Sequence, residues 1–113
     1  MEIKKLFGIE NKVAIVTGGS RGIGEMITSG FLANGVKVYI SARKAPALIE
    51  KAKELSDRYQ QECIPVPSDL STMEGIENFV GSISKKEEGI DFLINNAGAV
   101  SYTHLTLPTN REV

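Results

Sequence analysis

The sequence predicts an α/β fold, a partial and doubly wound parallel sheet of four strands with a helix between successive strands. Short apolar runs of strand length alternate with segments whose apolar residues recur every three or four positions. Strands that alternate with helices form parallel sheets, and their crossovers are right-handed in nearly all proteins. These crossovers predict the strand order 3-2-1-4, which reverses between strands one and four.

The predicted strands are short and rich in valine and isoleucine. The first is apolar without alternation, as expected for a strand covered on both faces of a parallel sheet. Cys63 lies in the third, where we expect it to act as a small buried hydrophobic residue. The strands are expected over residues 12–16, 36–41, 62–66 and 91–95.

The first two helices are predicted from apolar stripes over residues 21–34 and 47–60. Gly35 is well placed to end the first helix. The inward stripe of the first helix is expected to comprise Ile23, Met26, Ile27, Phe31 and Leu32. The inward stripe of the second is expected to comprise Leu48, Ala52, Leu55 and Tyr59.

A capping box predicts the start of the third helix, because Ser71 is followed three residues later by Glu74. In this interpretation the Ser71 side chain caps the helix. The charged run at 85–88 is interpreted as a solvated helix end. The inner face is expected to comprise Ile76, Phe79, Val80 and Ile83.

Composition disfavours several classes of function. The 113 residues allow one domain, and the net charge of −1 gives no attraction to nucleic acid or to an anionic membrane. No apolar run approaches the ~18 residues of a spanning helix, and no signal core follows the first residues. The single cysteine fits a reducing compartment, so we expect a cytoplasmic protein. The sequence also has no cysteine and histidine cluster for zinc.

A glycine-rich turn joins the first strand to the first helix. Residues 17–24 read Thr-Gly-Gly-Ser-Arg-Gly-Ile-Gly, directly after an apolar run. Gly18 allows a tight turn, Gly22 leaves no Cβ where backbone approaches a phosphate, and Gly24 lets the helix pack close to the strand. A strand, a glycine turn and a helix cradle a dinucleotide pyrophosphate, so the fold is predicted to be Rossmann-type. The alternative is a glycine turn without a ligand.

Three motifs in this order resemble the short-chain dehydrogenase/reductase family: the turn at 17–24, Asp69-Leu70, and Asn95-Asn96-Ala97-Gly98. The resemblance covers about residues 9–98, and segments 24–27 and 64–71 are most similar to NADPH-dependent 3-oxoacyl-thioester (acyl-carrier-protein) reductases. It implies an oxidoreductase that transfers hydride between a nicotinamide and a carbonyl or alcohol. The cofactor-binding residues that it implies are Gly18, Gly19, Ser20, Arg21, Gly22, Ile23, Gly24, Arg43, Asp69, Leu70, Asn96 and Gly98.

Two basic residues favour NADP(H), with NAD(H) the less favoured cofactor. An NAD site usually carries an acidic residue about twenty positions after the glycine turn, where it accepts hydrogen bonds from the ribose. By resemblance, Ala42 occupies that position, and Arg43 follows it. The resemblance also implies that a basic residue at Arg21 favours NADP. Two guanidinium groups can clamp a 2′-phosphate. The alternative is that both arginines are only solvated.

The resemblance assigns roles to the remaining site residues. Asp69 would accept a hydrogen bond from the adenine amino group, assisted by the backbone at Leu70. The alternative is that Asp69 caps the next helix. Asn96 and Gly98 would lie against the cofactor, while Asn95 would brace the strand. A purely structural asparagine turn is the alternative for this second segment.

No catalytic residue is expected within this chain. The family's Ser and Tyr-x-x-x-Lys follow the Asn-Asn-Ala-Gly segment, and the present sequence contains no Tyr-x-x-x-Lys. Tyr102 is followed four residues later by Thr106, and no acid or nucleophile is arranged around His104. We therefore expect the chain alone to be inactive, as the cofactor-binding part of a longer parent. The alternative function is a non-catalytic dinucleotide-binding module or sensor.

We expect the chain to divide after residue 99. Residues 1–99 would be the N-terminal part of an NAD(P)-binding Rossmann domain. Residues 100–109 lack helical or strand periodicity, and codons can be chosen for them that match a transposon adapter used in sequencing libraries. We therefore interpret 100–113 as a non-native read-through tail, with a divergent natural loop as the alternative. The parent is expected to be a homo-oligomer that acts on a small-molecule carbonyl or alcohol.

Overall fold

The computed structural model describes residues 11–96, in which strands and helices alternate along the chain. Every predicted strand and helix is present. The elements are β1 (Val13–Thr17), α2 (Gly22–Ala33), β2 (Lys37–Ser41), α3 (Ala45–Tyr59), β3 (Cys63–Pro65), α4 (Met73–Ser84) and β4 (Phe92–Asn95). None of the helices in this part of the chain has the length and apolar character needed to cross a membrane.

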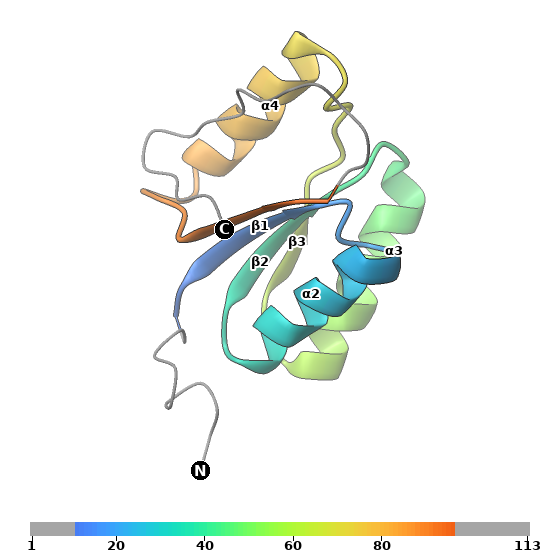
Figure 1. Ribbon diagram of the computed structural model, residues 1–113, viewed down its shortest axis with the longest axis vertical. Helices are drawn as coiled ribbons and strands as arrows, with labels where there is room; N and C mark the ends of the chain where they lie inside the picture. Colours follow the sequence, from blue (N-terminus) through green and yellow to red (C-terminus); the bar gives the residue numbers. More distant parts are fainter. Residues whose placement is uncertain (1–10, 97–113) are drawn as a thin grey trace.

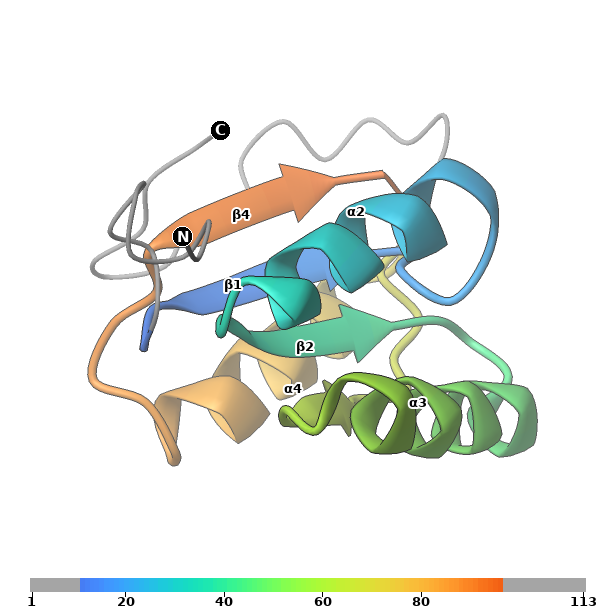
Figure 2. The same cartoon turned by 90° about the horizontal axis from the view of Figure 1, so that it is seen from below.

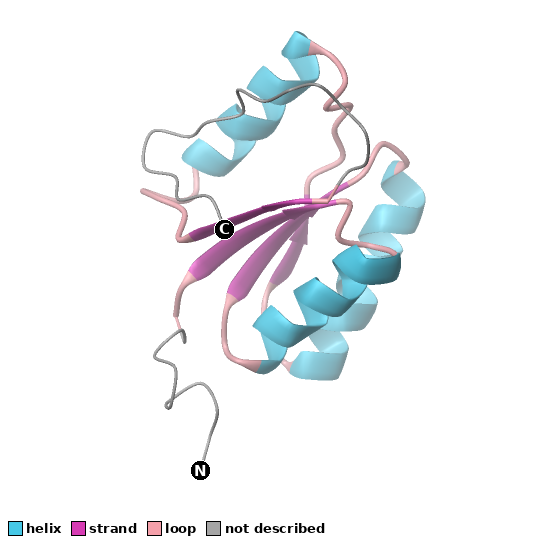
Figure 3. Cartoon of the chain, in the orientation of Figure 1, coloured by secondary structure: helices cyan, strands magenta, loops and turns pink. Residues whose placement is uncertain are grey.

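The four strands form one parallel sheet in the predicted order, β3-β2-β1-β4. The central strand β1 pairs with β2 from Val13 opposite Lys37 to Thr17 opposite Ser41. Helices α2 and α3 cover one face of the sheet and α4 covers the other (Figure 1 and Figure 3). The prediction of a Rossmann-type, doubly wound sheet is therefore confirmed.

Successive side chains of β1 point to opposite faces of the sheet and enter two separate cores. Ala14 and Val16 join the core on the side of α2 and α3, whereas Ile15 joins the core on the side of α4. All three are fully buried, because helices cover both faces (Figure 2). The continuous apolar character of this strand is thus explained by its central place in the sheet.

The inward face of α2 differs from the predicted stripe at the start of the helix. Ile23 and Met26 are 67% and 73% exposed, whereas Gly24, Thr28 and Leu32 are buried. The first turn of the helix lies so close to the glycine turn that only a small residue fits between them, and the two large side chains face outwards. The prediction for Ile23 and Met26 is therefore wrong, while the rest of the stripe packs against the core.

The starts of α3 and α4 also differ from the prediction. Helix α3 begins two residues earlier, because Pro46 is accommodated in its first turn, where its missing N–H breaks no helical hydrogen bond. Helix α4 is capped by Thr72, whose hydroxyl oxygen accepts a hydrogen bond from the N–H of Gly75 at 3.0 Å. The predicted cap at Ser71 is wrong by one residue, since its hydroxyl donates to the Asp69 carboxylate.

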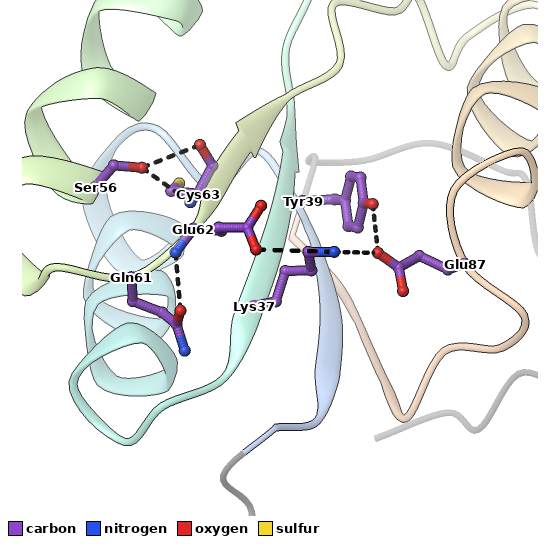
Figure 4. A network of polar contacts seen from close by, with 7 residues as sticks. All are labelled: Lys37, Tyr39, Ser56, Gln61, Glu62, Cys63 and Glu87. Atoms are coloured by element: carbon purple, nitrogen blue, oxygen red, sulfur yellow. Dashed lines mark hydrogen bonds and ion pairs between the residues drawn. The ribbon is translucent and has the colours of Figure 1, made fainter.

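The charged run after α4 is not fully solvated, contrary to the prediction. The Glu87 side chain is only 12% exposed. Its carboxylate accepts hydrogen bonds from Lys37 Nζ at 2.7 Å and from the Tyr39 hydroxyl at 2.6 Å (Figure 4). Lys37 and Tyr39 lie in β2, so the contact ties the segment after α4 to the sheet. It was missed because its members are about fifty residues apart, and the run alone carries no sign of its partners.

Cys63 is buried beside the α3 side of the sheet, as predicted. Burial raises the pKa of its thiol to about 12. The backbone N–H of Cys63 donates to Ser56 Oγ at 2.9 Å, which anchors the short β3 strand to α3 (Figure 4). The residue is therefore a structural hydrophobe with an unreactive thiol.

Candidate dinucleotide site

The glycine turn and the Asn95-Asn96 segment lie side by side at the carboxyl ends of β1 and β4. The strand register places Thr17 opposite Asn95. The chain leaves β1 towards β2 on one side, while β4 pairs with β1 on the other, so the strand order reverses at this point. Ligands of open α/β sheets bind outside the carboxyl ends of strands at such a reversal.

Backbone geometry explains three of the glycines in the turn. Gly18 and Gly22 have φ angles of 67° and 56°, a left-handed conformation that favours glycine. A Cβ on Gly24 would overlap the carbonyl oxygen of Gly18 and lie 2.7 Å from Asn96 Nδ2. A Cβ on Gly22 would have no neighbour within 4 Å, so the turn borders open space there. The close packing predicted at Gly24 is therefore against the turn itself and the end of β4.

Two buried threonines hold the turn in place, and sequence reasoning assigned neither of them a role. Thr17 Oγ1 donates to Asn95 Oδ1 at 3.0 Å and accepts from the N–H of Asn96 at 2.8 Å. Thr28 Oγ1 lies 2.8 Å from the carbonyl oxygen of Gly24 and 3.2 Å from that of Gly19. A hydroxyl placed among buried apolar residues was the signal that could have identified them, because such a group needs partners.

A pocket of about 430 Å³ opens beside the turn, beyond the carboxyl end of β2. It is lined by Arg21 from the turn and by Arg43 and Lys44 from the segment after β2. The two arginines that were paired from the sequence are thus brought into one pocket, together with two lysines, Lys44 and Lys51, that were not predicted to lie there. Ala42, which stands where an acid would favour NAD, also lines it.

Asp69 lies after β3, where its carboxylate is held by Ser71, two residues further along the chain. Its oxygen Oδ1 accepts hydrogen bonds from the backbone N–H of Ser71, at 3.0 Å, and from the Ser71 hydroxyl. These bonds, and to a lesser extent the positive charge of Arg43, lower the pKa of Asp69, so the carboxylate is an acceptor at neutral pH. A Cβ on Gly75 would overlap the carbonyl oxygen of Asp69, so α4 also packs directly on this residue.

Several expectations fall outside the described residues. They concern Gly98 in the third motif, Tyr102, His104 and the tail at 100–113. Within the described part of the chain, no group of three or more acidic, histidine or cysteine side chains is placed to hold a metal ion.

The profile of the short chain dehydrogenase family matches residues 12–112. The chain belongs to this family. The match runs through most of the segment at 100–113, so it gives no support to a read-through origin for that segment. The family assignment agrees with the resemblance carried by the glycine turn, Asp69-Leu70 and the Asn95–Gly98 segment.

Individual proteins of known name are also similar to this chain. A 3-oxoacyl-[acyl-carrier-protein] reductase of rhamnolipid biosynthesis from Pseudomonas aeruginosa is 40% identical over 92 residues, which are 81% of this chain and 35% of the relative. An NADP-dependent 3-hydroxy acid dehydrogenase from Schizosaccharomyces pombe is 34% identical, over 90% of this chain and 40% of the relative. The chain therefore spans about a third of the length of such relatives.

Solved structures agree with the fold of this chain. The RhlG/NADP active-site complex of Pseudomonas aeruginosa superimposes with a TM-score of 0.76 and 41% identity, covering 80% of this chain and 36% of that one. The L-sorbose reductase of Gluconobacter frateurii, solved with NADPH and L-sorbose, also gives 0.76, with 37% identity, 80% of this chain and 34% of that one. Both structures contain an NADP cofactor.

The geometry and charge of the residues around the turn fit a phosphate-bearing dinucleotide. The turn needs glycine at Gly18, Gly22 and Gly24 and borders open space at its outer side. The first N–H groups of α2 have no helical partner, and the helix dipole favours an anion near them. The adjoining pocket gathers Arg21 and Arg43.

Proposed function

We propose that this chain is the cofactor-binding part of an NADP-dependent short-chain reductase. The observation that carries the proposal is the pocket at the end of β2, which is lined by Arg21, Arg43 and Lys44. A phosphate monoester carries a charge of about −1.5 to −2 near neutral pH, and guanidinium groups bind it through paired hydrogen bonds. The 2′-phosphate is the group that distinguishes NADP from NAD, so a basic pocket beside Ala42 favours NADP.

The other parts of the cofactor would be held by residues on either side of the turn. Backbone N–H groups from Gly22 onward would bind the pyrophosphate at the start of α2. The ionised Asp69 would accept a hydrogen bond from the adenine amino group. Asn96, fixed through its N–H by Thr17, would lie against the ribose. When bound, the nicotinamide ring gives or takes the hydride.

We further propose that the longer protein acts on a small-molecule carbonyl or alcohol, with a 3-oxoacyl thioester as the first candidate. The relative from Pseudomonas aeruginosa is named a 3-oxoacyl-[acyl-carrier-protein] reductase, and the one from Gluconobacter frateurii an L-sorbose reductase. Both names describe reductases, which supports the reaction class more strongly than the substrate. We also propose that the longer protein is a homo-oligomer located in the cytoplasm.

Calorimetric titration of the 113-residue chain with NADPH and NADH tests the cofactor preference. We expect NADPH to bind at least roughly tenfold more tightly, because one charge-assisted hydrogen bond contributes about 1.5–3 kcal/mol. Arg43→Ala should remove most of the difference and leave NADH binding unchanged. In addition, 2′-AMP should compete with NADPH more effectively than 5′-AMP. Equal affinity of the wild-type chain for NADPH and NADH would refute the proposal.

A non-catalytic module would also bind NADPH, so a separate observation distinguishes it. The gene, read from an independent DNA source past codon 99, should continue to a Tyr-x-x-x-Lys pair. The corresponding longer protein should oxidise NADPH with a 3-oxoacyl thioester, and the 113-residue chain should not. A natural gene without that pair would favour the module.

A further inference from the structure

The pocket at the end of β2 contains acidic as well as basic side chains. Its cations are Arg21, Arg43, Lys44 and Lys51, and its carboxylates are Glu50 and Glu54. The acids come from α3, which forms the wall opposite the glycine turn. The acid-free position at Ala42 is evident from the sequence, but the carboxylates that α3 brings to the same pocket are not.

One of the two carboxylates is neutralised within the protein. Glu54 lies 2.7 Å from Arg58 Nη2 and 3.3 Å from Lys51 Nζ. Lys51 Nζ also lies 3.6 Å from Glu25 Oε1, on the neighbouring helix α2. This network contains two positive and two negative charges, so it presents little net field to a ligand in the pocket.

Glu50 has no such partner among residues 11–96. No hydrogen bond or ion pair joins its side chain to another residue of the described chain, and the side chain is exposed. Its carboxylate is therefore an uncompensated negative charge at the edge of a pocket that would receive a second anion. The positive charges of Arg21, Arg43 and Lys44 would attract the phosphate, and the repulsion from Glu50 would add to that attraction with the opposite sign.

We propose that Glu50 is a specificity-determining residue, which weakens binding of the 2′-phosphate and so limits the preference for NADP(H) over NAD(H). The inference rests on the proposed function, since it requires the phosphate to enter this pocket. NADH lacks the phosphate and is not repelled. Because Glu50 is close to solvent, the repulsion is moderate in size and is screened by salt.

The test compares Glu50→Gln with wild type in titrations with NADPH and NADH. The substitution keeps the size of the side chain and removes its charge. At low salt we expect the Kd for NADPH to fall roughly threefold, the size that Coulomb's law in water gives for a carboxylate and a phosphate separated by about a Debye length, ~10 Å. The Kd for NADH should not change. At about 1 M salt, where the Debye length is ~3 Å, the gain should disappear.

Glu77→Gln is the matched control, because Glu77 is an exposed carboxylate on α4, on the opposite face of the sheet (Figure 1). It makes the same change in net charge and should alter neither affinity. An unchanged Kd for NADPH in Glu50→Gln overturns the inference. A gain shared by NADH, a gain that persists at high salt, or a loss of NADH affinity also overturns it; the last would make Glu50 a ribose-hydroxyl acceptor.

Titration of Arg43→Ala in the same experiment distinguishes failure of the proposed function from failure of the role of Glu50. If it binds NADPH as tightly as wild type, the phosphate does not use this pocket and the proposed function fails. If it loses NADPH affinity while Glu50→Gln gains none, only the role of Glu50 fails. Thermal melts without ligand should be the same for Glu50→Gln and wild type, because no contact of Glu50 is removed.

Discussion

Replacing Gly24 with alanine is expected to destabilise the glycine turn, although alanine is the better helix former. The added Cβ would overlap the carbonyl oxygen of Gly18 and lie 2.7 Å from Asn96 Nδ2. The backbone of Gly18 is fixed, since its N–H donates to the carbonyl of Ser41 at 3.0 Å. No rotation of a side chain can therefore relieve the overlap with Gly18, and the turn or the helix has to move.

The size of the effect follows from two opposing terms. Overpacking typically costs about 1–3 kcal/mol, and the contact with backbone places Gly24 at the upper end. Helix propensity returns at most ~1 kcal/mol for glycine to alanine. We expect the free energy of unfolding to fall by about 1–2 kcal/mol. NADPH binding should also weaken, because the displaced turn carries the N–H groups that would hold the pyrophosphate.

Gly30→Ala is the matched control within the same helix. Gly30 is exposed, and an added Cβ there would meet nothing within 4 Å. The free energy of unfolding should therefore rise by about 0.5–1 kcal/mol. Both variants are compared with wild type by urea denaturation followed by circular dichroism, and by titration with NADPH. A Gly24→Ala protein at least as stable as wild type would refute the packing argument.

Two further predictions concern the other end of the sheet and the tail. Burial raises the pKa of Glu87, but hydrogen bonds from Lys37 and Tyr39 more than offset it, so the pKa lies below its ordinary value of 4.5. Glu87→Gln should cost about 1–3 kcal/mol near neutral pH in urea denaturation. A depressed carboxyl pKa stabilises the fold only while the group is ionised, so this difference should shrink as the pH falls below 4.5, and a constant difference would contradict the mechanism. Deletion of residues 100–113 should change neither the melting temperature nor NADPH affinity; a fall of several degrees would contradict the read-through interpretation.

Structural features that follow from short segments of the sequence and their order were predictable. The strand order followed from alternating elements and the handedness of their crossovers, and the register then brought Thr17 opposite Asn95. The positive φ angles at Gly18 and Gly22 were also foreseeable, because a sharp strand-to-helix turn demands them.

Features that depend on how two elements pack were not predictable in the same way. Ile23 and Met26 satisfy a helical stripe, yet the close approach at Gly24 rotates them outwards. Periodicity reports which side of a helix is apolar, but the contact that fixes the rotation of α2 is a backbone contact with no hydrophobic signal. The stripe therefore failed in the one turn where a close backbone contact competes with the burial of large side chains.

The charged side chains of the candidate phosphate pocket were also only partly predictable from the sequence. Arg43 could be read from its place after β2, because strand ends meet the site in every sheet of this type. Glu50 lines the pocket as Arg43 does, but only because α3 packs beside the glycine turn. Strand-end residues alone therefore predict only the sign of a cofactor preference. If Glu50 acts as proposed, the size of that preference depends as well on a side chain that the neighbouring helix brings to the same pocket.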